Sequence, residues 1–504
     1  MALQRTQARS SRWRSVGTAM VLAALVVPSA AGASKQLEIG VSDPAITDGD
    51  PAVLTAFAPR WRDAGVDVAM VTADWRAIAP DAEKETPPVG FDGSDPQSSL
   101  YDWERLDRMI ETLTRNKIDP ILTVTGPGPL WGSSDPEHGS ARYRPDTVLF
   151  AQFAAAVARR YGDDVDRYTI WYEPNSPANL RPQYICVRKK CAERSPSIYR
   201  EIFADAAPAI RASDSGAAVY AGALAGRGSN PTDSDSQMKP LIWLRSFGCL
   251  ADNNKADRTS AKCVDFTPAE VDGFAYHPDQ RAQSPSSHLK SWAEAGIGDT
   301  IRITHILDFL QETGGLINNE KESSPISLFY TEFGYQTNPP DVFSGVGLGT
   351  QATWLQQSAR LAFNQARVKL LGQYIWRDHA IHDNGQGTDA YDGSQSGLYM
   401  FDGSEKPSAR AFLNPFWASR SSDGRSARLW GQVRPGAAHE VVVERRIGRG
   451  SFRRLSSVTT DANGYFELSA RLKATATYRF YWVGRVGKAS SRRHLSAAMT
   501  LKRR

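Results

Sequence analysis

The chain lacks the features that would fix it in a membrane or attract it to a polyanion. After residue 33, no stretch reaches the ~18 consecutive apolar residues that a spanning helix needs, so we expect no integral membrane segment in the mature chain. The net charge is only +5, and it falls to about +1 without residues 1–33, which carry four arginines and no acidic residue. We therefore expect no nucleic-acid partner.

Residues 1–33 differ from the rest of the chain. Their four arginines precede an apolar stretch over 16–27, which is followed by the small residues Ala31, Gly32 and Ala33. This order is typical of a secretory signal peptide, and its apolar core is too short to serve as a mature spanning helix. We predict a secreted, extracellular protein, and leave open an association with the cell envelope.

Cysteine is scarce, and the positions of the cysteines argue against a zinc-binding site. The four cysteines, Cys186, Cys191, Cys249 and Cys263, form two sequence-local pairs in polar segments, without the spacings or the accompanying histidine of a zinc site. In an oxidising compartment this favours loop disulfides 186–191 and 249–263, although four cysteines allow three connectivities.

The sequence pattern changes near residue 415. Before it, strand-like runs alternate with helix-like stretches; after it, short alternating segments are separated by turn residues. We predict a first domain over 34–415, a small all-β sandwich over 416–490 and a basic tail over 491–504. The sandwich could bind glycan, dock onto the first domain or act as a spacer.

Eight apolar runs in the first domain read as buried strands, each preceded or followed by helix-like sequence. This alternation predicts an α/β fold, a parallel (β/α)₈ TIM barrel, and favours closure over a doubly wound sheet. The predicted strands are 36–41, 66–71, 118–125, 167–172, 217–223, 271–276, 326–331 and 371–376.

Two glutamates end two of these strands. Glu173 follows the fourth strand and Glu332 follows the seventh, and the carboxyl ends of barrel strands meet at one face, where such enzymes place their chemistry. Two carboxylates brought together there are what retaining glycoside hydrolysis requires. Other strand-end residues converge on the same face: Asp74, Trp75, Trp131, His277 and Trp376.

The motifs around these glutamates resemble those of the clan A glycoside hydrolases, including the family 39 and family 5 types. Ile170-Trp171-Tyr172-Glu173-Pro174-Asn175 is similar to their acid/base signature, and Tyr330-Thr331-Glu332-Phe333-Gly334 is similar to their nucleophile strand. The segment from Gly397 to Pro407 resembles a closing loop of such relatives. The resemblance covers residues 36–415.

The resemblance implies an O-glycosyl hydrolase acting on a glycan, with Glu332 as nucleophile, Glu173 as acid/base, and no cofactor or metal. His277 and Tyr330 are candidates to position the nucleophile, and Trp376 to stack beneath a sugar ring. The remaining candidates for substrate contact are Tyr172, Asn175, Asp74, Trp75 and Trp131. Core packing is the competing interpretation for the aromatic residues, and a structural hydrogen bond is the competing interpretation for His277.

Three positions depart from the family pattern. Tyr172 stands where an asparagine that binds the sugar's 2-hydroxyl is usual, Met70 replaces an arginine of strand two, and Asp279 replaces a tyrosine after strand six. Without that asparagine, the sugar could be axial or modified at its second carbon, or a furanose. The same departures motivate an alternative, a non-catalytic carbohydrate-binding protein on a degenerate barrel. A third interpretation, a structural wall protein, gives the paired glutamates no function.

Overall fold

The computed structural model describes residues 33–503 apart from 189, 383–384, 386, 392–394, 486 and 488–490. The predicted signal peptide therefore lies outside the described residues, except for Ala33. Among the described helices, none combines the length and the apolar character that crossing a membrane requires.

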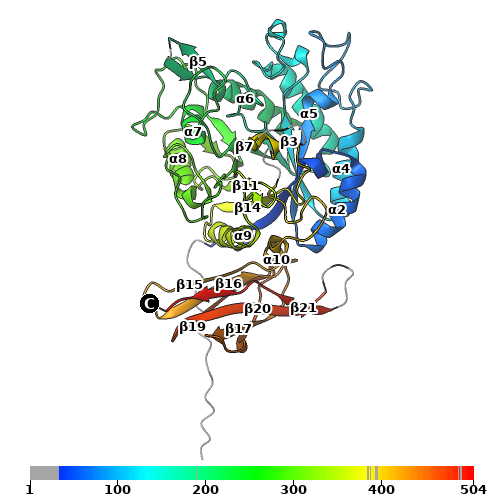
Figure 1. Cartoon of the computed structure of the whole chain (residues 1–504). Helices are drawn as coiled ribbons and strands as arrows, with labels where there is room; N and C mark the ends of the chain where they lie inside the picture. The colour runs from blue at the N-terminus through cyan, green and yellow to red at the C-terminus, as the bar shows by residue number, and fades with distance from the viewer. Residues whose placement is uncertain are drawn as a thin grey trace, which may run out of the picture.

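Eight parallel strands close into a barrel, as the sequence predicts (Figure 1). Most of them are almost wholly buried, because helices cover the barrel outside and side chains fill it inside. In chain order the strands are β1 (Glu38–Ser42), β2 (Val68–Asp74), β3 (Asp119–Thr125), β4 (Arg167–Ile170), β7 (Ala218–Ala225), β9 (Gly273–His277), β11 (Leu328–Phe333) and β14 (Val368–Tyr374).

Amphipathic helices pack around this barrel. In α4 (Glu104–Arg115) the buried residues Leu106, Met109, Ile110 and Leu113 recur with helical spacing and form one apolar stripe. The other long helices are α2 (Pro51–Asp63), α5 (Thr147–Tyr161), α6 (Ser195–Ser213), α7 (Pro240–Phe247), α8 (Thr300–Glu312) and α9 (Leu348–Phe363). Shorter helices are α1 (Pro44–Thr47), α3 (Trp75–Ile78), α10 (Pro407–Leu413), η1 (Leu130–Gly132), η2 (Pro136–His138), η3 (Ile297–Asp299) and η4 (Gly387–Ala390).

Small paired strands and two disulfides order the loops. Cys186–Cys191 closes the hairpin of β5 (Tyr184–Val187) and β6 (Lys190–Glu193), and Cys249–Cys263 ties the segment after α7. These are the two pairings that the sequence favours. The other short strands are β8 (Ala269–Val271), β10 (Leu316–Asn318), β12 (Thr337–Asn338) and β13 (Val346–Gly347).

The inside of the barrel changes from apolar to polar along the strands. Val68 and Ile121 belong to a buried apolar cluster, and side chains two positions further along a strand point to the same face. On that face, Thr72 pairs in register with Thr123, which pairs in register with Thr169. Threonine hydroxyl groups therefore line the inside of the barrel near the carboxyl ends of its strands.

The strands between Phe416 and Leu501 form two antiparallel sheets packed face to face. One contains β15 (Phe416–Arg420), β16 (Ser426–Gln432) and β19 (Tyr465–Arg471); the other contains β17 (Glu440–Ile447), β18 (Arg453–Thr459), β20 (Ala476–Gly484), β21 (Arg492–Leu495) and β22 (Met499–Leu501). The segment predicted as a basic tail, 491–504, differs from that expectation, because β21 and β22 both pair with β20. Arg492 and Arg493 are exposed, and the alternation of buried and exposed side chains begins only at His494, so the sequence of this strand resembles a solvated tail.

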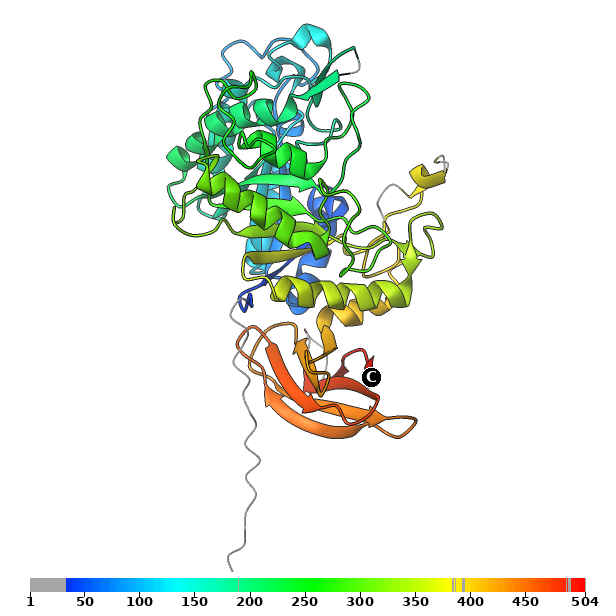
Figure 2. The same cartoon turned by 90° about the vertical axis from the view of Figure 1, so that its left-hand side faces the viewer.

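The sandwich packs beside the barrel, against the helices α9 and α10 (Figures 1 and 2). Tyr465 donates its hydroxyl to the carbonyl of Leu37, just before β1, at 3.3 Å, and packs on Phe363 at 4.7 Å between ring centroids. Arg360 forms an ion pair with Glu467 at 2.8 Å. Of the roles considered for this module, the structure shows docking, onto the side of the barrel that α9 and α10 cover.

Candidate active site

Glu173 is presented by an irregular turn at the end of β4. Trp171 and Glu173 have φ angles of 65° and 41°, which non-glycine residues seldom adopt and which cluster at functional sites. The N–H of Tyr172 donates to Thr125 Oγ1 at 3.0 Å, and the N–H of Glu173 donates to the carbonyl of Ala223 at 3.1 Å. Ala223 lies in a register shift of β7, so neighbouring strands on both sides hold the turn.

Glu332 lies on β11 itself. The register between β11 and β14 shifts between Tyr330 and Phe333, and both Thr331 and Glu332 line the same pocket. Consecutive residues of a regular strand point to opposite faces, so this irregularity turns Glu332 into the barrel mouth. Ser42 Oγ donates to Glu332 Oε1 at 2.9 Å, and the Tyr172 hydroxyl lies 3.3 and 3.2 Å from its two oxygens.

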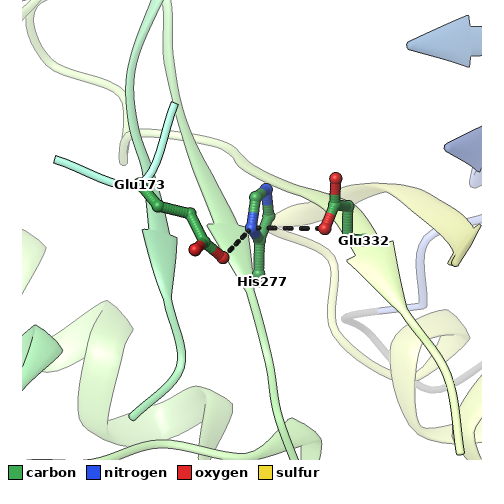
Figure 3. A group of neighbouring side chains, drawn as sticks. All are labelled: Glu173, His277 and Glu332. Carbon is green, nitrogen blue, oxygen red and sulfur yellow. Dashed lines mark hydrogen bonds and ion pairs between the residues drawn. The ribbon is translucent and has the colours of Figure 1, made fainter. Parts of the chain in front are cut away.

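His277, the last residue of β9, lies between the two glutamates (Figure 3). Its Nδ1 is 2.9 Å from Glu173 Oε1 and 3.6 Å from Glu332 Oε2. The imidazole is nearly buried, while the side chains of Glu173 and Glu332 are 23% and 12% exposed. The three residues thus form one contiguous group that is open enough for a ligand to reach.

Burial and mutual charge set the protonation of this group. Burial raises the pKa of Glu332, and the charge of Glu173 raises it further, against the opposing effects of His277, Ser42 and Tyr172. Burial disfavours the charged form of His277, but the two carboxylates outweigh burial and raise its pKa. Burial and the same two carboxylates raise the pKa of Tyr172 well above its usual range, so its hydroxyl stays a proton donor.

The separation of the two carboxylates restricts the chemistry. The ligand atoms of Glu173, His277 and Glu332 all lie within 4.8 Å of one another. Retaining glycosidases hold their carboxyl groups about 5–5.5 Å apart, whereas inverting enzymes need about 6.5–9.5 Å to admit a water molecule. One nitrogen and two carboxylate donors could also hold a metal ion, but Ser42, Tyr172 and the imidazole already supply hydrogen bonds to these carboxylates.

A pocket of about 250 Å³ opens beside Glu332. Liquid water occupies about 30 Å³ per molecule, so the pocket has room for several waters or for a sugar-sized group. It extends toward the first three strands, and its lining is rich in hydroxyl groups. The lining residues are Ser42, Pro44, Thr47, Asp48, Met70, Thr72, Asp74, Thr123, Thr125, Gly126, Pro127, Thr169, Tyr172, Asn179, Ala223, His277, Thr331 and Glu332.

The structure does not bring the predicted tryptophans to this pocket. Trp75 is fully buried and packs on Phe153 and Trp131, at 6.0 and 5.8 Å between ring centroids. A Cβ atom on Gly128 would lie 2.4 Å from the Trp75 ring, so the glycine-containing loop after β3 covers it closely. Trp131 donates its indole N–H to the carbonyl of Pro80 at 3.0 Å. The prediction that both bind substrate is therefore corrected in favour of core packing.

Trp376 and Tyr330 are corrected in the same way. Trp376 is 3% exposed and packs between Trp61, Tyr399 and Phe412, so it offers no stacking floor to the pocket. The Tyr330 hydroxyl lies 2.7 Å from Thr300 Oγ1. Neither side chain is among the residues that line the pocket beside Glu332.

Of the other positions that the sequence analysis named, some line the pocket and some only support the surrounding loops. Asn175 is fully buried, its amide bonds the backbone of Ala225 and Met238, and it lies outside the pocket lining, so it anchors the loop after β4. Asp74 lines the pocket and also caps α3. Asp279 forms an ion pair with Arg227 at 2.8 Å, outside the pocket lining.

The sequence alone did not identify Ser42, Asp48 or the threonines inside the barrel (Thr72, Thr123 and Thr169) as pocket residues. A signal for the threonines was present: Thr123 and Thr125 interrupt an apolar strand at alternate positions, and so do Thr72 and Asp74. In a strand buried on both faces, polar residues with period two indicate a polar cavity on one face. Ser42 and Asp48 carry no comparable pattern.

No family model matches the sequence, and no curated protein sequence matches it. Solved structures with similar folds include a glucosidase from Croceicoccus marinus, 13% identical over 88% of this chain and 94% of that chain, with a TM-score of 0.49. A GH5_18 variant from Streptomyces cattleya in complex with Manβ1-4GlcNAc is 11% identical over 74% of this chain and 79% of that chain, with a TM-score of 0.46. A family 1 β-glucosidase from Thermotoga maritima is 14% identical over 76% and 97%, with a TM-score of 0.44. At these identities and TM-scores, the activities of those proteins are not transferred to this chain.

Proposed function

We propose that the protein is a retaining O-glycosyl hydrolase of the clan A type. The observation that carries the proposal is the pair Glu173 and Glu332, placed at the ends of two barrel strands with ligand oxygens within 4.8 Å of each other. That spacing suits a carboxylate that attacks the anomeric carbon and a carboxylic acid that protonates the departing oxygen. The hydroxyl groups around Glu332 suit a sugar ligand.

Glu332 acts as the nucleophile in this proposal. Its carboxylate attacks the anomeric carbon while Glu173, in its acid form, gives its proton to the departing glycosidic oxygen. The glycosidic bond breaks and a glycosyl ester on Glu332 forms. Glu173, now a carboxylate, takes a proton from a water molecule that attacks the anomeric carbon and releases Glu332.

Ser42 and Tyr172 keep the nucleophile ionised. Burial disfavours the carboxylate of Glu332, and the two hydroxyl donors oppose that effect. They also fix its orientation, because the donors reach it from two different strand ends. Tyr172 is thereby engaged with the nucleophile and is not free to replace the amide that usually binds a 2-hydroxyl.

His277 orients the acid/base. Its raised pKa favours the form in which Nδ1 carries a proton and donates to Glu173 Oε1, which leaves Oε2 to carry the catalytic proton. The charge on the ring also lies near Glu332 Oε2 at 3.6 Å, where it favours the ionised nucleophile.

The proposal also includes the compartment in which the protein works. Two disulfides support a protein that works in an oxidising compartment. Together with the predicted signal peptide, they favour secretion, with a glycan of the surroundings or of the cell envelope as substrate.

The direct test is release of reducing ends from a panel of envelope and plant glycans. The wild-type protein is compared with Glu332→Gln, Glu173→Gln and the control Glu320→Gln, an exposed glutamate. We expect activity in the wild type and the control, loss in both site variants, and no effect of EDTA. Equal glycan binding by all four proteins without turnover would favour the carbohydrate-binding alternative, and loss with EDTA would favour a metal at Glu173, His277 and Glu332.

A further inference from the structure

The pocket beside Glu332 is lined by further acidic side chains. Asp48 and Asp74 line it together with Glu332, and among the described lining residues there is no lysine or arginine. His277 is the lining side chain that can carry a positive charge, and it already faces Glu173 and Glu332. Negative charge in the part of the pocket near Asp48 is therefore not balanced from within the pocket.

Asp48 is held in this position at an energetic cost. The N–H of Thr72 donates to Asp48 Oδ1 at 3.1 Å. Burial raises the pKa of Asp48 to about 6, even though the hydrogen bonds of Thr72 and the charge of Arg105 oppose the shift, and the charge of Asp74 adds to it. Arg105 is not part of the lining; its Nη2 lies 3.5 Å from the carbonyl of Thr72.

A second, independent observation points to a ligand. Thr169 and Thr331 are 1% and 4% exposed, both line the pocket, and neither hydroxyl has a hydrogen-bond partner among the described residues. A buried hydroxyl left without a partner costs about 1–3 kcal/mol. Two such groups on β4 and β11, facing one cavity, are suited to the polar groups of a bound molecule.

We propose that this pocket binds a sugar that carries a free amino group, with its ammonium paired with Asp48 and Asp74 and its hydroxyls bonded to Thr169 and Thr331. An ammonium balances the carboxylate charges, whereas a neutral sugar leaves them unbalanced in a partly desolvated site. A uronate or sulfated sugar would add like charge and is rejected. The inference rests on the proposed function in one respect: the amino sugar is the unit whose glycosidic bond Glu332 attacks.

Calorimetric titration of the wild-type protein near neutral pH tests the ligand directly. The probes are glucosamine and galactosamine, their N-acetylated forms, glucose, galactose, glucuronate and galacturonate, none of which has a glycosidic bond to cleave. We expect one or both hexosamines to bind at least about tenfold tighter than their N-acetylated and neutral counterparts, and the uronates not to bind.

Matched variants assign the effect to the carboxylates. Asp48→Asn and Asp74→Asn should each remove the preference for the free amine, and the second keeps a side chain able to cap α3. Asp50→Asn is the control, because Asp50 lies two residues from Asp48, is exposed, and caps α2 as asparagine also can. A preference that survives both pocket variants, tighter binding of neutral or N-acetylated sugars, or failure of both hexosamines to bind at tens of millimolar overturns the inference.

The outcomes for binding and for catalysis are separable. Cleavage of glycans that requires Glu332 but shows no preference for amino sugars overturns this inference and leaves the proposed function standing. Hexosamine binding that depends on Asp48, without cleavage that depends on Glu332, supports the inference on ligand chemistry and contradicts the proposed function.

Discussion

The hydroxyl of Tyr172 lies within hydrogen-bond distance of both carboxylate oxygens of Glu332, at 3.3 and 3.2 Å. Tyr172 precedes Glu173 in the chain, so one turn after β4 supplies both a donor to one glutamate and the other glutamate itself. Met70 stands where the family resemblance leads one to expect an arginine, and it lines the same pocket as Glu332, to which Ser42 and Tyr172 donate.

Replacing Tyr172 with phenylalanine should slow turnover by about 10- to 100-fold, because a hydrogen bond to a charged group contributes about 1.5–3 kcal/mol. The hydroxyl lowers the pKa of Glu332, so its loss should raise that pKa and move the acidic limb of the pH–rate profile to higher pH. Tyr168→Phe is the matched control, since Tyr168 lies on β4 but directs its hydroxyl to Asp214. An unchanged acidic limb in Tyr172→Phe would contradict this role.

Glu332→Gln should lower turnover by at least about 10³-fold and yet leave the protein folded. Because burial raises the pKa of Glu332, the ionised side chain destabilises the folded state above the unfolded pKa. The neutral amide removes that cost, so the melting temperature near neutral pH should be equal to or higher than that of the wild type. A lower melting temperature, measured by calorimetry, would mean that Glu332 is a structural residue.

His277→Gln should change how stability depends on pH. The pKa of His277 is raised in the folded state, so its protonated form contributes stability that is fully present below the unfolded pKa of about 6.5 and is lost as pH rises through the higher folded value. The difference in unfolding free energy between wild type and variant should therefore shrink toward alkaline pH. A difference that grows with pH would contradict a protonated imidazole between the two glutamates.

Asp48→Asn should stabilise the protein near neutral pH by about 1–2 kcal/mol. The folded pKa of about 6 lies above the ordinary 3.8, so the wild type loses stability as pH rises from about 4 to about 6 and the loss is complete above that range. The full linkage value would be about 3 kcal/mol, reduced here because Asp48 is partly exposed. Denaturant unfolding at several pH values measures the effect, and the difference between wild type and variant should vanish near pH 4. A variant that is less stable at neutral pH would show that Asp48 serves the fold.

The eight barrel strands were predictable because each is an apolar run buried on both faces, and their order along the chain fixes a parallel barrel. The strand ends were less predictable: β14 begins at Val368, three residues before its predicted start, because Lys369 interrupts the apolar run. The signal peptide and the catalytic roles of Glu173 and Glu332 remain predictions.

The paired glutamates could be found from sequence because strand position alone brings Glu173 and Glu332 to one end of the barrel. The aromatic candidates could not be placed, since whether Trp75 faces a pocket or the core depends on how closely Gly128 and its loop approach it. Tyr172 was noticed only as a departure, because its contact with Glu332 depends on the left-handed turn at Trp171. Such local irregularities leave no periodic signal in the sequence.

The most direct test of the central claim is the anomeric configuration of the first product, followed by proton NMR during hydrolysis of a glycan that the wild-type protein cleaves. The spacing of Glu173 and Glu332 predicts that the first-formed sugar keeps the configuration of the bond that was broken, and that Glu332→Gln yields no product. A first-formed sugar of inverted configuration would contradict the account, because it requires a water molecule between carboxylates that lie too close to admit one.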